Sequence, residues 1–229
     1  TGPVTGTEVL PIDPMTAITS GRVARVPVLI GTNTDEFSLF VALQYLKHHE
    51  LPPYRQLLDE TFGAGAAAVA ERYPLDHYAG NTGLAYSAAV TDGVFACPTE
   101  RITAGLVHSA PVYAYEFNDR TAPAPDPMRH VPFPVGASHS LELRYLFDIG
   151  GAPPLNPAQQ VLSDQMVAYW SQFVKTGAPD VEGQPEWPQL GADAATGPRM
   201  SLQTGPLSIT TDYAARHQCA FWATVKGAG

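Results

Sequence analysis

A glutamate and a histidine are the residues of this chain whose types and spacing best suit chemistry. Glu36 follows an apolar, β-branched run at residues 26–30 and then Gly31, where a buried strand is expected to end. His139 comes 103 positions later (139 − 36), after a second apolar run and a long loop. An imidazole base oriented by a carboxylate is what a serine nucleophile needs to lose its proton. The pair therefore predicts the acid and the base of a hydrolase.

The order of these two residues places the expected nucleophile. In α/β-hydrolases the nucleophile comes first in the chain, then the acid, then the histidine. The serine is therefore expected before Thr1, outside this chain. Ser138 lies in a Gly-x-Ser-x-Ser sequence, but a proline-rich loop precedes it instead of the strand that a nucleophile elbow needs. From its position after a strand alone, Glu36 could also be a surface glutamate without a catalytic role.

Composition excludes several classes of function. The chain has 229 residues, a net charge of −9 and only 13 Lys and Arg, which are scattered, so no nucleic-acid partner is expected. No apolar run reaches the roughly 18–20 residues that cross a bilayer, so no membrane association is expected. His48-His49-Glu50 could suggest a metal, but adjacent histidines on a helix face different directions and no further ligand is placed, so a solvated helix end is the preferred interpretation. We therefore expect no metal and no cofactor.

The elements that must position Glu36 and His139 alternate between strands and helices. This alternation predicts an α/β fold with a mostly parallel sheet flanked by helices, in a single unit over residues 1–229. Strands are expected at 26–30, 111–117, 200–202 and 207–210; helices at 36–46, 54–73 (two, separated by Gly63–Gly65), 84–106 (interrupted at Pro98), 162–174 and 216–225; a turn at 81–83; and irregular chain at 1–25 and 118–138.

Several local sequences resemble one known family. Gly31-Thr32-Asn33-Thr34-Asp35-Glu36, followed by Phe40, is similar to the acid motif of type B carboxylesterases, the family of bacterial para-nitrobenzyl esterases and cholinesterases. Residues 136–147 are similar to the histidine motif of that family, including the glutamate three positions after the histidine. Further similar stretches lie at residues 26–31, 170–179, 187–188 and 219–222. Phe37 and Ser140 are departures, since the family often has glycine at both positions.

The resemblance implies a role for each matching residue. It makes this chain the C-terminal half of an α/β-hydrolase fold, with Glu36 orienting the imidazolium and His139 acting as general base and then general acid. Leu39 and Phe40 are implied to line the substrate pocket, although a place in the helix core is equally compatible with them. Glu142 is implied to support the histidine loop by hydrogen bonds.

The two cysteines, Cys97 and Cys219, match the positions of a disulfide in the cholinesterase branch. Two buried free thiols are the alternative on composition alone. The crosslink would close 122 residues (219 − 97) and contribute roughly 4–5 kcal/mol in the chain-entropy model. It would also imply an oxidising compartment, and hence secretion.

The resemblance also implies what this chain lacks. The serine and the oxyanion-hole glycines of the family belong to its N-terminal half, without which Glu36 and His139 have no acyl chemistry to perform. We therefore expect a carboxylic ester hydrolase with a Ser-His-Glu triad and an acyl-enzyme, inactive as this chain alone. Its expected partners are a small-molecule ester and the N-terminal half of the same esterase. The alternative function is a non-catalytic, cholinesterase-like module for adhesion or scaffolding.

Overall fold

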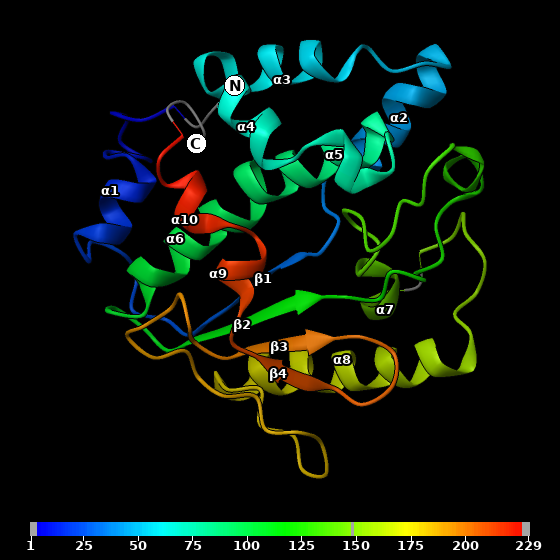
Figure 1. Ribbon diagram of the computed structural model, residues 1–229. Coiled ribbons are helices and arrows are strands. Elements are labelled where there is room, and N and C mark those ends of the chain that lie inside the picture. The colour runs from blue at the N-terminus through cyan, green and yellow to red at the C-terminus, as the bar shows by residue number, and fades with distance from the viewer. Residues whose placement is uncertain (1–3, 148, 226–229) are drawn as a thin grey trace.

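A four-stranded sheet forms the centre of the fold in a computed structural model that describes residues 4–147 and 149–225 (Figure 1). The strands lie in the order β1-β2-β3-β4. β1 and β3 pair with β2 in parallel, and β4 pairs with β3 antiparallel. The bounds are Val28–Asn33 for β1, Val112–Phe117 for β2, Arg199–Leu202 for β3 and Ser208–Thr210 for β4. The expected α/β fold with a mostly parallel sheet is confirmed.

Helices cover both faces of the sheet (Figure 1). β2 shows why, because its aromatic residues Tyr113 and Tyr115 contact Phe173 and Trp170 of α8, while Val112 and Ala114 of the same strand pack in a second core with residues of α6. A parallel strand buried on both faces explains the continuous apolar run. The long helices are α2 (Ser38–His48), α3 (Tyr54–Phe62), α4 (Ala66–Arg72), α5 (Thr82–Val90), α6 (Cys97–Leu106) and α8 (Pro157–Thr176).

Short helical segments complete the chain. They are α1 (Pro14–Thr19), η1 (Gly63–Gly65), η2 (Leu75–Tyr78), the π-helix η3 (Thr91–Ala96), η4 (Asp126–His130), α7 (Leu143–Leu146), α9 (Tyr213–Arg216) and α10 (Cys219–Trp222).

The first strand differs from its expected bounds. It begins at Val28 instead of residue 26, and it continues through Gly31 to Asn33, so that Gly31 does not turn the backbone. Gly31 pairs with Tyr115 in the sheet, and a β-carbon at position 31 would overlap the Tyr115 ring and carbonyl oxygen. A glycine is needed here for close approach between strands, and the sequence did not distinguish that need from a turn.

Four other expectations were wrong in detail. Helical segments interrupt both regions expected to be irregular: α1, which the side chain of Asp13 caps, lies in residues 1–25, and the 3₁₀-helix η4 lies in residues 118–138. Asn81 is not in a turn but caps α5, because its side chain accepts the Leu84 N–H. The break in the long helical pattern is the π-helix η3, and Pro98 follows it in the first turn of α6, a favoured place for proline. The last expected helix is two short ones, broken at Gln218, which has a φ of 56°.

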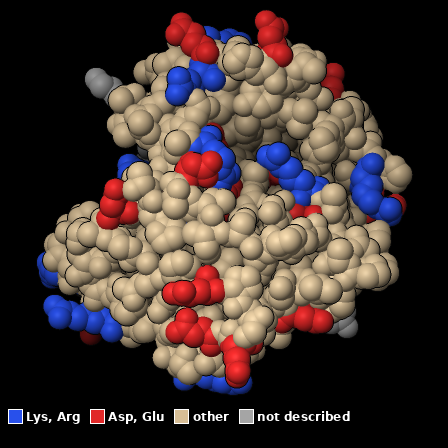
Figure 2. Space-filling model, turned by 60° about the horizontal axis from the view of Figure 1, so that its bottom comes forward, with Lys and Arg blue, Asp and Glu red and all other residues tan. Residues whose placement is uncertain are grey.

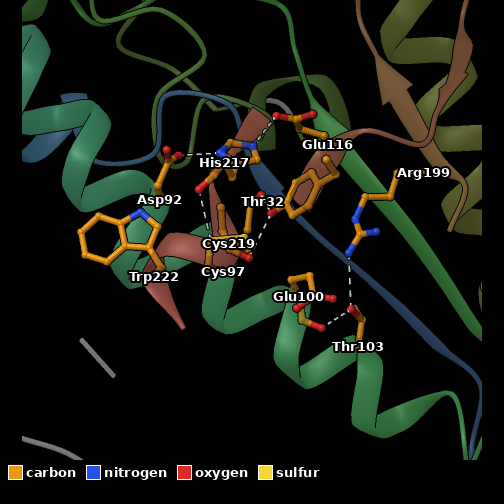
Figure 3. Close-up of a disulfide and its surroundings, with 12 residues drawn as sticks. Thr32, Asp92, Cys97, Glu100, Thr103, Glu116, Arg199, His217, Cys219 and Trp222 are labelled. Carbon is orange, nitrogen blue, oxygen red and sulfur yellow. Dashed lines mark hydrogen bonds and ion pairs between the residues drawn. A yellow bond between two sulfur atoms is a disulfide. The ribbon is translucent and has the colours of Figure 1, made fainter. Parts of the chain in front are cut away.

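A disulfide between Cys97 and Cys219 joins α6 to α10, as the resemblance implied, and closes a loop with a sequence separation of 122 (Figure 3). Beside it lies His217, which is buried between two carboxylates. Its Nδ1 is 2.6 Å from Asp92 of η3, and its Nε2 is 2.9 Å from Glu116 of β2. Arg216 also forms an ion pair with Glu116. The disulfide and this ionic network together fix the C-terminal segment against η3 and the central strand.

Candidate active site

Glu36 lies just beyond the carboxyl end of β1, in the turn that leads into α2. Its Oε1 accepts the backbone N–H of Asn33 at 2.8 Å, and its Oε2 is 2.7 Å from Nδ1 of His139. The Glu36 side chain is only 9% exposed. Burial raises the pKa of Glu36 above its usual range, and the hydrogen bonds from Asn33 and His139 oppose this effect without cancelling it. The structure thus brings the two residues singled out by sequence into direct contact.

The loops that carry the two residues are joined by their backbones. Asp35 donates its N–H to the Ala137 carbonyl at 3.0 Å, and His139 donates its N–H to the Glu36 carbonyl at 3.3 Å. The carboxylate of Asp35 accepts the Ala137 N–H at 3.0 Å and pairs with Arg120. These bonds set the distance between acid and base independently of the two side chains.

Left-handed backbone conformations shape the histidine loop. Gly136 has a φ of 58°, and a β-carbon there would collide with the Asp35 carboxylate. Ser140, directly after the histidine, has a φ of 70°. This is a region that glycine adopts freely and that other residues enter at a cost. The departure at Ser140 therefore places a strained residue next to His139, where the family often has glycine.

The side chain of Asn33 connects β1 to the histidine loop. Its Nδ2 donates to the Ser138 carbonyl at 2.8 Å and also to Oε2 of Glu142. Glu142, which follows His139 in the chain, is thus bonded to Asn33 at the end of β1, the strand that leads to Glu36. The motif contains Asn33, but residue type alone did not indicate its position between the two loops.

Aromatic rings surround the histidine on one side. The ring of Phe40 is 5.3 Å from that of His139, and the ring of Phe95, from η3, is 5.9 Å from it. Phe37 contacts Phe40 at 5.2 Å and Tyr86 edge-on at 5.5 Å. We call Phe37, Phe40 and Phe95 the aromatic cluster. Phe37, which stands where the family often has glycine, contacts both other rings of this cluster. The backbone N–H of Phe37 donates to Thr91 Oγ1 of η3 at 3.0 Å.

Sequence reasoning missed one member of this cluster. Phe40 was expected at the pocket and lies beside His139 with 36% of its surface exposed, whereas Leu39 is half-buried on the same helix. Phe95 was not singled out, because it lies in the irregular part of a helical pattern where a 3.6-residue period does not predict which face points inward. The only local feature that could have indicated Phe95 is its position directly before Ala96-Cys97-Pro98.

No serine accompanies the pair in the part of the chain that the structure describes. There, Nε2 of His139 has no hydrogen-bond partner, and the His139 side chain is 43% exposed. The Ser138 hydroxyl is fully buried and makes no hydrogen bond. Residues 4–147 and 149–225 also contain no group of three or more His, Cys, Asp and Glu that could hold a metal, and no helix long and apolar enough to cross a membrane.

A cavity of about 710 Å³ opens beside the two loops. Asp35, Gly136 and Arg120 line it together with the buried network around His217, but neither Glu36 nor His139 does. It therefore lies next to the acid–base pair and not on it. Figure 2 shows one face of the molecule, with charges of both signs scattered and a hollow near its middle that has Lys or Arg side chains beside it.

A family model described as the carboxylesterase family matches residues 1–222. The chain belongs to the carboxylesterase family. Within it, the chain is 29% identical over 207 residues to acylcarnitine hydrolase of Rattus norvegicus, which covers 81% of this chain and 35% of that protein. It is 28% identical to pyrethroid hydrolase Ces2a of Mus musculus (81% and 36%) and 26% identical to cocaine esterase of Oryctolagus cuniculus (73% and 34%).

This carboxylesterase-family chain spans about a third of the length of the curated relatives it matches. The structure is consistent with part of an α/β-hydrolase fold. Its sheet ends at β1, which is paired with another strand on one side only among the described residues.

Proposed function

We propose that this chain supplies the acid and the base of a serine carboxylesterase that hydrolyses carboxylic esters through an acyl-enzyme. The contact of 2.7 Å between Glu36 Oε2 and His139 Nδ1 is the observation that carries the proposal. A carboxylate on Nδ1 leaves Nε2 to accept a proton. Membership of the carboxylesterase family supports the class of reaction.

In the proposed mechanism, Nε2 of His139 takes the proton of the serine hydroxyl as the oxygen attacks the ester carbonyl. Glu36 holds the imidazole in place and stabilises the imidazolium that forms. The same proton then passes to the departing alcohol, which leaves the acyl group on the serine. His139 next takes a proton from a water molecule as the water oxygen attacks the acyl carbon. The bond between that carbon and the serine oxygen then breaks, the serine takes the proton back from His139, and the carboxylic acid product is released. No cofactor or metal takes part in any of these steps.

The aromatic cluster supports a preference for apolar esters. Phe40 and Phe95 lie beside the base with their rings partly exposed, so a bound acyl or alcohol group would contact them. Contact with apolar and aromatic groups would remove their surface from water at roughly 25 cal/mol per Å². The names of the similar proteins, which are hydrolases and an esterase, support hydrolysis as the class of reaction.

The serine and the oxyanion hole are proposed to come from an N-terminal segment of the same esterase, docked against β1. Val28, Leu29 and Ile30 of β1 are only partly buried although they are apolar. An edge strand of this kind has backbone groups ready to pair with a further strand. Coexpression of the upstream segment with this chain should give a complex that copurifies; two parts that purify separately would contradict the docking.

The full-length protein that contains this sequence tests the mechanism. On short-chain para-nitrophenyl esters, His139→Ala should lower kcat by about 10⁴-fold or more and Glu36→Gln by about 10³–10⁴-fold. His130→Ala is the matched control, because that side chain is 72% exposed. Activity retained in His139→Ala would exclude this base. A folded full-length protein without any esterase activity would favour the non-catalytic adhesion or scaffolding module.

The disulfide supports a proposal of secretion or of another oxidising compartment. Thiol titration of the denatured, non-reduced protein from its native source tests it. No reactive thiol from Cys97 or Cys219 is expected; two free thiols would contradict the proposal.

A further inference from the structure

Asn33 occupies a position from which one residue reaches both sides of the acid–base pair. It ends β1, where it is paired with Phe117 of β2, and it is 2% exposed. Its backbone N–H donates to Glu36 Oε1 at 2.8 Å, while its side-chain amide donates to the Ser138 carbonyl at 2.8 Å. The acid and the residue before the base are therefore both bonded to one rigid strand residue.

The side-chain amide of Asn33 also bonds a second carboxylate near the pair. Its Nδ2 donates to Oε2 of Glu142, whose negative charge acts on Glu36. Both partners of this nitrogen are hydrogen-bond acceptors, and the side-chain oxygen of Asn33 could donate to neither of them. The partners therefore determine which end of the amide is the nitrogen. Only a neutral side chain with two N–H groups can make both bonds without adding a charge near Glu36 and Glu142.

We infer that Asn33 is a positioning residue for the Glu36–His139 pair, acting by donating hydrogen bonds to the histidine loop and to Glu142 while its backbone holds Glu36. The inference rests on the proposed function for its kinetic consequence. Its structural consequence, the geometry of the pair, does not depend on activity.

Asn33→Asp in the full-length protein is the decisive variant. It keeps the size of the side chain, cannot donate when ionised, and adds a third carboxylate. We expect kcat on para-nitrophenyl esters to fall by about 10- to 100-fold, the scale of a small misplacement of a reacting group, with KM changed by less than about twofold. The acid limb of kcat/KM should move to higher pH, because added negative charge favours the protonated form of the pair.

Asn156→Asp is the matched control, because Asn156 is an exposed cap of α8 and aspartate caps a helix equally well. It should leave kcat and the pH profile unchanged. Asn33→Asp combined with Glu142→Gln restores one donor–acceptor bond with its direction reversed, and it should recover part of kcat. A residue that only fills space would give no such recovery.

A readout without turnover separates this inference from the proposed function. The Nδ1 proton of His139, hydrogen-bonded to Glu36, should give a downfield NMR signal that is absent from His139→Ala. The signal should be lost or broadened in Asn33→Asp and retained in Asn156→Asp. If the native protein lacks esterase activity but the signal behaves in this way, the proposed function fails and the positioning role holds. An unchanged signal, or kcat within about threefold of native with an unshifted acid limb, would overturn the positioning role.

Discussion

Ser140 shows how a single substitution next to the base alters the stability of the site. A left-handed conformation costs a residue with a β-carbon roughly 1–2 kcal/mol, and Ser140 has a φ of 70°. The backbone bonds between the acid and histidine loops keep the segment in place despite this cost. The strain is thus offset by the rest of the loop.

We predict that Ser140→Gly stabilises the protein. Relief of the strain exceeds the greater flexibility of glycine in the unfolded chain, so we expect a gain of about 0.5–1 kcal/mol in the free energy of unfolding. Denaturant unfolding measures it.

Two controls accompany this change. Ser140→Ala keeps the strain and should give no gain. Ser208→Gly, at an exposed position of β4, should cost about 0.5–1 kcal/mol, because glycine weakens a strand. A loss of stability in Ser140→Gly would show that its conformation is not strained.

At the scale of elements, the π-helix η3 links the site to the C-terminal segment. Thr91 of η3 accepts the N–H of Phe37, Phe95 contacts His139, and Asp92 bonds His217. Directly after η3, Cys97 bonds Cys219. One wall of the candidate site therefore depends on the packing of residues near position 217.

The ionic network around His217 predicts a dependence of stability on pH. Burial lowers the pKa of His217, but hydrogen bonds and charge interactions with Asp92 and Glu116 outweigh this and raise the pKa to about 9. A raised histidine pKa stabilises the folded state below the unfolded value of about 6.5, and the stability is lost as pH rises through about 9. Arg216 beside Glu116 remains charged throughout, and the buried Tyr73 and Tyr213 remain neutral, because their pKa values are raised.

We expect the free energy of unfolding to fall by up to about 3 kcal/mol between pH 6.5 and 9.5. Urea unfolding at several pH values measures it. His217→Gln should be less stable at pH 6.5 and should lose most of this slope, whereas His130→Gln at an exposed site should retain it. If the free energy of unfolding of the native protein did not change between pH 6.5 and 9.5, His217 would not be charged in the folded state.

The sequence predicted most elements because their signals are local. The apolar run of β2, the core of α8 and the two helices around Gly63–Gly65 all follow from periodicity and turn chemistry. The start of α8 was missed, because the helix begins at Pro157 after a capping box at Asn156, five residues before the apolar pattern expected from residue 162. The contact between Glu36 and His139 followed from motif order. The π-helix and the position of Asn33 could not be predicted, because both are set by contacts between segments far apart in the chain.

At the scale of the whole molecule, the disulfide ties distant parts of the chain together. It crosslinks residues with a sequence separation of 122, from one end of α6 to the first residue of α10. Such a crosslink stabilises mainly by limiting the freedom of the unfolded chain, by roughly 4–5 kcal/mol.

We predict that reduction lowers the melting temperature by roughly 5–15 °C. Differential scanning calorimetry with and without a reductant measures the shift. The double variant Cys97→Ala with Cys219→Ala should melt at the lower temperature and should not respond to the reductant. An equal response in that variant would trace the effect to the reductant itself.

The parallel pairing of β1 with β2 has a consequence for how fast the chain reaches its native state. Val28 is aligned with Val112, a separation of 84 positions (112 − 28), and β2 is aligned with β3 across a further 85 (200 − 115). Only β3 and β4 form a local hairpin among the described residues. The parallel pairs β1–β2 and β2–β3 join segments far apart in the chain, so for them the loop entropy is lost before any ladder bond forms. High contact order of this kind slows folding to milliseconds or longer. During that interval the apolar strands stay exposed, so the yield of refolding should depend on dilution and temperature more than on final stability.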